Sequence, residues 1–580
     1  MRTGEPHLNS PEKVCDIVLK GGIASGIVYP LALVCLAKEY RFSSIGGTSA
    51  GAMAAAAAAA AEYGRNIEGA GFERLARIPN EIGPTLLSMF QPTPVLRPLH
   101  NIFVAALKAE TPVGRATAFI GAAIKGYYCS AVLGVSPGVV IILAALAFRL
   151  GAGFVALGLL VALVGLVVAI LWRLVKAANT ELVENGFGLC PGIRQPYALT
   201  EGFTDWLARL IDEAAGLPAD TDRPLLFGDL AAPPDGRPPI QLAMMTTSLM
   251  ERRPYTLPLA DRRFVFERSE WAKIFPARII AYLTKKCDPF RPLAGESGEY
   301  YYFPDQAKLP LIVAARMSLS FPGLISTVPL WSRDFTLADD AEQKTLRRCL
   351  FSDGGLSSNF PIHFFDHLLP NNPTFAISLD RYSAKRNRKE NIWLPSIAIS
   401  GSELPIQPFH SLASFLLRLI DSAKDWQDNL QSTLPGYRER IAHIALKSDE
   451  GGLNIAMDDV TIQKLVAYGQ HAGETLCKEF DLDSHRWRRF LVAMARMEES
   501  LDELATAYDG MPGGPEAFKD FLARYAQQPE QYKQDLPIVE AMLVRARELA
   551  SIGVRWREAP TIRDGHIPKP ATNLRISPKP

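Results

Sequence analysis

The sequence from Phe42 to Ala61, FSSIGGTSAGAMAAAAAAAA, decides the fold of this chain. Phe42–Ile45 is typical of a short β-strand, and the eight consecutive alanines Ala54–Ala61 predict a helix, because alanine is the strongest helix former. A turn rich in glycine joins the two. Val14–Leu19 and the apolar helical pattern after it show the same order once before. Two strand–turn–helix units in succession predict an α/β fold with a largely parallel sheet.

The rest of the chain continues this pattern and then becomes mostly helical. Further strand-like runs occur at Ile240–Thr246, Leu309–Ala314 and Phe375–Leu379. Charged helical segments dominate after residue 390, namely Ser411–Asp428, Asp459–Phe480, Ser484–Tyr508 and Ile538–Ile552. We therefore expect a three-layer α/β/α domain over residues 1–390 and a mostly helical region over 391–555. The final stretch, 556–580, is rich in proline and is expected to be extended or disordered.

Composition excludes several classes of protein. Hydrophobic residues make up 48% of the 580 residues, which supports large buried cores and excludes an intrinsically disordered chain. The 62 Lys and Arg nearly balance the 61 Asp and Glu, so no basic excess indicates nucleic-acid binding. The seven cysteines form no C-x-x-C pair, which predicts reduced core thiols rather than disulfides or a cysteine-based zinc site.

Two uncharged apolar runs, Ala131–Phe148 and Leu150–Trp172, are separated only by Arg149. The second would form a helix of about 34 Å, which matches a hydrocarbon core of about 30 Å. We expect a hydrophobic helical hairpin over 131–172, inserted in the α/β domain. The cations Lys125 and Arg173 flank it, so both ends would face the cytoplasm and the protein would be membrane-associated. A buried helical pair or a wedge in one leaflet is the alternative.

Gly47-Thr48-Ser49-Ala50-Gly51 matches the G-x-S-x-G nucleophile elbow. A serine at the apex of a sharp strand-to-helix turn exposes its hydroxyl, and Gly47 and Gly51 permit the contorted backbone. The positive end of the following helix favours negative charge that develops at Ser49. The position of this pentapeptide between a predicted strand and a predicted helix is the context that such an elbow requires.

Two further turns carry glycine pairs. Gly21-Gly22-Ile23 follows the first strand, and successive backbone N–H groups in such a turn form an anion-binding concavity suited to an oxyanion hole. It lacks the glycine spacing of nucleotide-binding loops, which disfavours a nucleotide. Asp353-Gly354-Gly355 follows a short apolar strand, and taken alone it is an ordinary D-G turn.

The three turns occur in the same order in the patatin-like phospholipases, which this chain resembles over residues 14–380. Three supporting stretches also resemble that family: Phe227–Leu230, Ala315–Pro322 and Asn359–Pro361. The chain departs from the family pattern at two positions. Ile23 replaces the usual third glycine, and Ser25 replaces the basic residue common before the closing glycine.

The resemblance implies hydrolysis of lipid esters by a Ser–Asp dyad. Ser49 would be the nucleophile, and Asp353 would accept its proton and return it. The N–H groups of Gly21, Gly22 and Ile23 would supply the oxyanion hole, and the glycines that shape the other two turns are Gly47, Gly51, Gly354 and Gly355. A phospholipid or other lipid ester in the bilayer would be the substrate, and neither a metal nor an organic cofactor is expected.

Alternatives to this reaction stay open. A histidine-based triad would use His363 or His367 near Asp353 in the sequence, although both histidines and Asp366 are expected on a helix face as local structural residues. The same Ser49 would serve a transacylase if an alcohol, rather than water, captured the acyl group. A third alternative is a catalytically silent, membrane-bound interaction protein that binds a protein partner through its C-terminal helices.

Overall fold

The central sheet of the molecule is built around five parallel strands. In this computed structural model, which describes residues 11–569 except 23, 84, 109–111, 219–220, 261, 294–296, 383–390, 396–402, 405, 407, 409–410, 448–449, 452–453, 527–531 and 533, their order is β14-β12-β1-β2-β4. The strands are β14 (Ile441–Leu446), β12 (Thr374–Arg381), β1 (Lys13–Leu19), β2 (Tyr40–Gly47) and β4 (Gln241–Ser248). The expected mixed α/β fold with a mostly parallel central sheet is confirmed.

Antiparallel strands extend the sheet beyond β4. β11 pairs with β4, and the order continues through β10, β6, β8 and β7. These strands are β11 (Leu346–Asp353), β10 (Val328–Arg333), β6 (Val265–Glu267), β8 (Tyr300–Tyr302) and β7 (Pro289–Phe290). β5 (Arg253–Leu257) pairs with β4, and β13 (Ile392–Trp393) pairs with β14. β11 is the element that brings Asp353 to the centre of the molecule.

The two faces of the sheet are covered differently. Ile17 of β1 belongs to the large core formed with α1 (Tyr29–Ala37), α2 (Ala50–Tyr63), α10 (Phe203–Ala214), α14 (Leu311–Ser318) and α17 (Asp459–Glu479). Val18 faces the other way, into a smaller cluster with Phe360, Ile362 and Phe364. The segment that follows Asp353 therefore forms part of the cover on the second face.

One predicted strand is wrong. Leu309–Ala314 was expected to be a strand, but Leu311–Ser318 forms helix α14, which begins directly after Pro310. All eight of its residues are buried, and a short, continuous apolar run has no periodicity that separates a buried strand from a buried helix.

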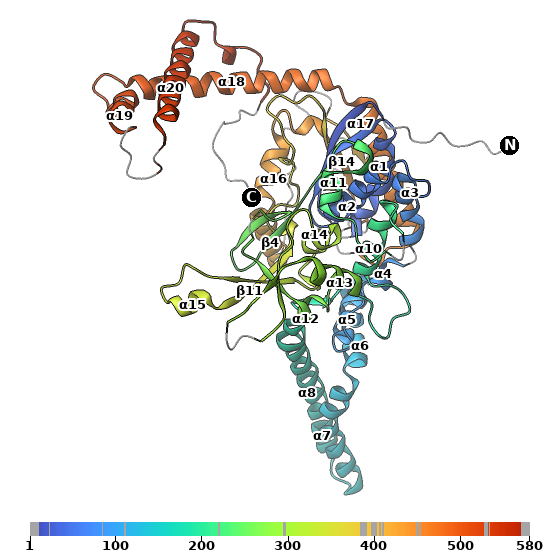
Figure 1. Cartoon of the computed structure of the whole chain (residues 1–580). Coiled ribbons are helices and arrows are strands. Elements are labelled where there is room, and N and C mark those ends of the chain that lie inside the picture. The colour runs from blue at the N-terminus through green and yellow to red at the C-terminus, as the bar shows by residue number, and fades with distance from the viewer. Residues whose placement is uncertain are drawn as a thin grey trace, which may run out of the picture.

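The C-terminal half contributes to the core as well as to outlying helices. β14 adds a strand to the central sheet, and Gly469 of α17 packs so closely on α1 and its preceding turn that a Cβ there would collide with the Val28 carbonyl. The predicted helices are confirmed as α16 (Leu412–Thr433), α17, α18 (Leu482–Asp509) and α20 (Leu536–Arg557). In Figure 1, α18, α19 (Phe518–Tyr525) and α20 form an arm at one end of the body. Residues 570–580 of the expected tail lie outside the described residues.

The two apolar runs form α7 (Tyr128–Ala147) and α8 (Ala152–Lys176), which extend together from the body (Figure 1). Small residues allow close contact, because a Cβ on Gly134 or Gly138 would collide with the carbonyl oxygen of Gly165 or Gly158 on the other helix. Both helices are long and apolar enough to cross a membrane, and only 17% and 11% of their most apolar windows are buried. A soluble core helix would be mostly buried.

Candidate active site

Ser49 lies at the sharp turn between β2 and α2. Its backbone has φ 54° and ψ −128°, a combination that side-chain-bearing residues rarely adopt, and its side chain is buried. Strain of this kind persists only where the surrounding structure holds it, and it concentrates at functional sites. The backbone N–H of Ser49 donates to Ser318 Oγ at 3.1 Å, which is one of the contacts that hold the turn.

The two glycines of the pentapeptide are required by close packing. A Cβ on Gly47 would lie 2.5 Å from the carbonyl oxygen of Gly51 and 2.9 Å from that of Leu19. A Cβ on Gly51 would collide with the Leu19 carbonyl. The first helical turn of α2 therefore rests directly on the end of β1, and any larger residue would push Ser49 away from the first glycine turn.

Asp353 ends β11 and lies near the same edge of the sheet. It pairs with Thr246 on β4, while Gly47 pairs with Met244 two residues earlier on that strand. Asp353 Oδ1 accepts a 2.7 Å hydrogen bond from the Gly355 N–H. Asp353 Oδ2 is buried and accepts no hydrogen bond from the described residues.

Burial controls the ionisation of Asp353. It raises the pKa of this carboxyl to about 6, and the hydroxyl of Ser49 and the N–H of Gly355 act in the opposite direction by interacting with the carboxylate. In this structure the Ser49 hydroxyl makes its 3.0 Å hydrogen bond to the carbonyl oxygen of Gly22. The structure thus brings Ser49 and Asp353 together from distant parts of the chain, with the hydroxyl turned toward the first glycine turn.

The first glycine turn lies against Ser49, and its backbone N–H groups differ in whether they are already hydrogen-bonded. The Gly21 N–H donates to the Asn359 carbonyl at 2.7 Å, so this donor is already engaged. The N–H of Gly22 makes no hydrogen bond within the described part of the chain and is available. Ile23 lies outside the described residues. Of the two expected oxyanion donors that the structure describes, Gly22 is the one left free beside the serine.

Several residues that support the site were not identified as site residues from the sequence. Asn359 was noted only as part of a motif, but its carbonyl binds Gly21 N and Thr48 Oγ1, the latter at 3.0 Å. Ser320 accepts the Asp353 N–H through its carbonyl at 3.0 Å. Asp428 of α16 accepts hydrogen bonds from the same loop. No local signal in the sequence shows these contacts, because the partners of each residue lie far away in the sequence.

The histidines near Asp353 occupy a loop. His363 lies in a turn and His367 in the irregular chain that follows it, rather than on the expected helix face, so that expectation is wrong. The carboxylate of Asp366 is bound by Arg440 and Arg489, each at 3.0 Å, and so has a structural role. Among the described hydrogen bonds, none joins a histidine to Ser49 or Asp353. Burial lowers the pKa of His363, which keeps its imidazole neutral.

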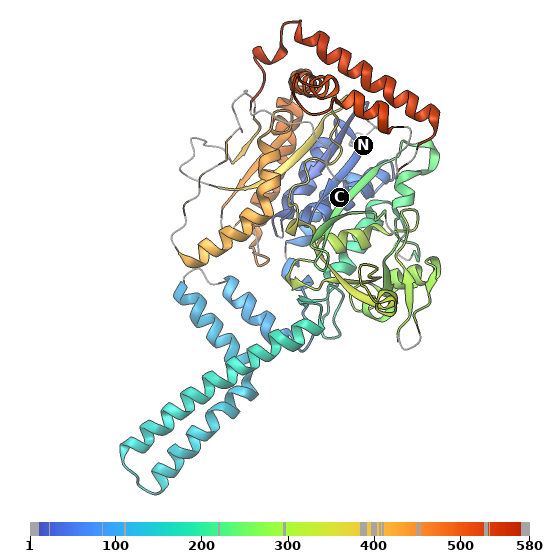
Figure 2. The ribbon, with the colours of Figure 1, turned by 90° about the vertical axis from the view of Figure 1, so that its left-hand side faces the viewer.

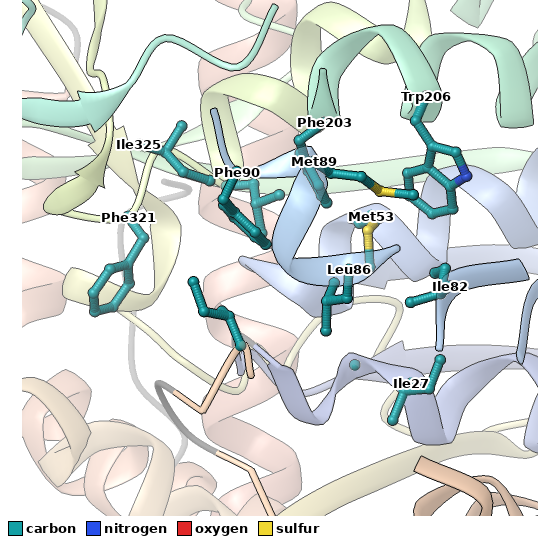
Figure 3. Close-up of a pocket in the computed structure, with 13 residues that line it drawn as sticks. Ile27, Met53, Ile82, Leu86, Met89, Phe90, Phe203, Trp206, Phe321 and Ile325 are labelled. Carbon is teal, nitrogen blue, oxygen red and sulfur yellow. The ribbon is translucent and has the colours of Figure 1, made fainter. Parts of the chain in front are cut away.

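An apolar pocket begins one helical turn after Ser49. Met53, whose N–H donates to the Ser49 carbonyl at 3.2 Å, lines it together with Ile27 of the turn after Gly22 (Figure 3). The space between the lining residues is about 590 Å³, open solvent at its mouth included, and the lining side chains are apolar apart from the indole nitrogen of Trp206. Figure 3 shows Phe90, Phe203 and Trp206 around it. A second apolar pocket shares Met53 and Ile27 with the first.

Within the described ranges, no group of three His, Cys, Asp or Glu side chains is placed to hold a metal ion.

Comparison with known proteins gives one relative over nearly the full length. The chain is 32% identical to the "RpoH suppressor" of Rhizobium meliloti (strain 1021) in an alignment that covers 98% of this chain and 99% of that protein. No protein-family model matches. The solved structures to which the chain is similar include VipD from Legionella pneumophila (TM-score 0.29, 14% identity, 95% of this chain and 86% of that chain) and the SpcU–ExoU complex from the type III secretion system of Pseudomonas aeruginosa (TM-score 0.22, 16% identity, 95% and 80%). Similarities at these TM-scores do not establish a shared fold.

Proposed function

This chain belongs to the family of the RpoH suppressor of Rhizobium meliloti, a name that assigns no chemistry, and we propose its activity from the site itself. The protein is a membrane-associated serine lipid acyl hydrolase of the patatin-like phospholipase type. The observation that carries this proposal is a serine on a strained strand-to-helix turn, beside a buried carboxylate and an apolar pocket.

Ser49 and Asp353 carry out the proposed reaction. The Ser49 hydroxyl turns from the Gly22 carbonyl to Asp353, gives its proton to the carboxylate, and its oxygen bonds to the ester carbonyl carbon. The negative charge that forms on the carbonyl oxygen is stabilised by the N–H of Gly22 and the positive end of α2. The C–O bond to the alcohol then breaks, and the alcohol leaves with the proton from Asp353.

Water completes the cycle. Asp353 takes a proton from water, whose oxygen attacks the acyl-enzyme, and the fatty acid leaves as the proton returns to Ser49. A carboxyl whose pKa is about 6 is mostly ionised at neutral pH and is also close enough to that pH to give the proton back. This balance supports a single carboxylate in both the base and the acid role.

The apolar pocket supports a long acyl chain as the group transferred. Its lining consists of apolar and aromatic side chains, and the polar atom among them is the buried indole nitrogen of Trp206, which has no hydrogen-bond partner among the described residues. Met53 links it directly to the helical turn of Ser49. An acyl chain in this pocket would place its ester at the elbow.

The α7–α8 pair supports attachment to the membrane. Lys125 lies before α7, and Arg173 and Lys176 end α8, so the cations gather where the pair meets the body. Arg173 is held there by an ion pair with Glu181 at 2.5 Å. We propose that the pair enters the bilayer from the cytoplasmic side and that the α/β body remains on that side.

Lipid mass spectrometry and active-site labelling test the proposal. Membranes that contain the wild-type protein should release free fatty acid and a lysolipid or alcohol, and Ser49→Ala should release neither. A fluorophosphonate should label the wild type at Ser49. Acyl transfer to an added alcohol in preference to water would identify a transacylase, and an unlabelled Ser49 would identify a silent interaction protein.

A further inference from the structure

Helix α16 exposes an apolar stripe to its surroundings. The stripe consists of six large side chains that are 40–73% exposed: Leu412, Phe415, Leu416, Leu419, Trp426 and Leu430. They recur at intervals of three, four and seven residues, which places them on one side of a helix. A surface helix normally turns such a side toward the core, so α16 presents the reverse arrangement.

The opposite side of α16 carries a buried carboxylate. Asp428 follows Leu419 by nine residues, or about two and a half turns, and is only 5% exposed. Its two oxygens accept three hydrogen bonds, from Ser358 Oγ at 2.7 Å, the Asn359 N–H at 2.6 Å and the Phe360 N–H at 2.8 Å. Asp428 thus attaches α16 to the loop that follows Asp353.

That loop connects the three turns of the active site. It begins at the Asp353 turn, and the carbonyl of Asn359 accepts from Gly21 N of the first glycine turn at 2.7 Å and from Thr48 Oγ1 of the serine elbow at 3.0 Å. The Asn359 N–H is one of the donors bound by Asp428. A shift of α16 would therefore be transmitted to the nucleophile, the base and the oxyanion turn together.

We propose that the apolar stripe of α16 rests on the lipid surface and that this contact, through Asp428, holds the three catalytic turns in register. The inference rests on the proposed lipid hydrolase activity and adds its regulation: contact with a bilayer stabilises the assembled site. Asp428 is a positioning residue in this scheme and touches no reacting atom. Lys424 lies on the same helix, and its positive charge is the smallest of the influences that oppose the burial by which the pKa of Asp353 is raised.

The position of α16 favours lipid over another occupant. In Figure 2, the N-terminal end of α16 descends toward the end of the body from which α7 and α8 project. Helix α6 (Pro112–Gly126), which leads into α7, exposes Phe119 and Ile120 in the same part of the molecule. A bilayer that receives the α7–α8 pair would meet further apolar side chains along α6 and α16.

Fluorescence quenching tests the contact without requiring any activity. The full chain is reconstituted into vesicles of phosphatidylcholine with a minority of phosphatidylglycerol, with or without bromine on the acyl chains. Trp426 and Trp487 of α18 are matched, at 57% and 59% exposure, but lie on different helices. The fluorescence of each tryptophan is obtained as the difference between the wild type and the variant that lacks it, Trp426→Phe or Trp487→Phe. Brominated lipid should quench the fluorescence of Trp426 and leave that of Trp487 unchanged.

Turnover tests the connection to the site. For each variant, the rate on vesicle phospholipid is divided by the rate on a soluble short-chain ester. Trp426→Gln should lower this ratio about tenfold, equivalent to about 1.4 kcal/mol, while Trp487→Gln should leave it as in the wild type. Asp428→Ala should lower kcat on both substrates with little change in KM for the soluble ester.

A conservative change separates positioning by Asp428 from general destabilisation. In Asp428→Asn, the amide oxygen keeps the two backbone donors and the amide NH₂ donates to the Ser358 hydroxyl, so most of the kcat should return. Asp421→Ala, two turns earlier on the same side of α16, is the control for loss of a carboxylate. Equal losses in Asp428→Asn and Asp428→Ala would contradict the positioning role.

Several outcomes would overturn the lipid contact. They are equal quenching of the two tryptophans, an unchanged turnover ratio in Trp426→Gln, or a wild-type dimer that Trp426→Gln converts to a monomer, which would assign the stripe to a second copy of the chain. Selective quenching of Trp426 in a protein that cleaves no ester would refute the proposed hydrolase activity and leave the membrane contact standing.

Discussion

Helices α2 and α8 are both uncharged over most of their length, yet one lies in the centre of the protein and the other outside it. Ala54–Ala61 of α2 are all buried, whereas Leu159, Leu160 and Leu163 of α8 are at least 57% exposed. Alanine allows α2 to approach β2, α3 (Gly71–Ile82), α10 and α14 closely, while the leucines of α8 have no such partners around them. Side-chain size, rather than the lack of charge, separates a helix that is packed by protein from one suited to lipid.

The largest expected effect on activity comes from substitutions in the Ser49–Asp353 dyad, at the start of the buried helix α2. Ser49→Ala and Asp353→Asn should each lower ester hydrolysis by about 10⁴-fold or more, because nucleophile and base act as a unit. Both variants should stay in the membrane fraction with the wild type, since α7 and α8 are unaltered. Product analysis with membrane fractionation measures both. His363→Ala and His367→Ala should keep most activity, and near-total loss in either would refute the dyad.

The pH dependence follows from burial at the same place. Because the pKa of Asp353 is raised to about 6, activity should fall about tenfold per unit as the pH drops below 6, where the base is protonated. Asp353→Asn should also raise the melting temperature at neutral pH: a raised pKa means that the folded state disfavours the charged form, and this cost is absent for an amide. A rate on soluble ester that is flat from pH 7 to 5 would contradict this assignment.

Substitutions within the two helices test the role of side-chain size directly. Ala56→Leu places three extra carbons at a fully buried position of α2 and should lower the free energy of unfolding by about 1–3 kcal/mol. Leu160→Ala removes the same atoms from an exposed position of α8 and should change it by less than about 0.5 kcal/mol. Denaturant unfolding of the α/β body gives both values. Similar losses in the two variants would show that α8 is packed against protein.

The smallest effect is expected where α7 and α8 touch. Gly165→Leu would collide with the Gly134 carbonyl and should force the two helices apart. Spin labels on α7 and α8 should report a longer distance, whereas the melting temperature of the body and the rate on soluble ester should stay close to those of the wild type. A matched change at Gly153, which has open space around it, should leave the distance unaltered.

The sequence predicted local features well where neighbouring residues alone determine the conformation. The pentapeptide around Ser49 predicted the elbow, and the alanine run and the two apolar runs predicted α2, α7 and α8. It failed for α14, where a buried helix and a buried strand share the same apolar pattern. It also missed β14, which adds a strand to the central sheet from the region expected to be helical.

Taken by itself, the sequence determined which residue types could act. A serine within a glycine turn and an aspartate before a glycine pair are each recognisable from a few consecutive residues. Only the tertiary structure decided which groups meet. In the folded chain, the Gly21 N–H donates to the Asn359 carbonyl, the Gly22 N–H stays available, and Asp428 binds the loop that follows Asp353. These contacts join residues tens to hundreds of positions apart, and burial, which sets the pKa of Asp353, exists only once the sheet is closed around it.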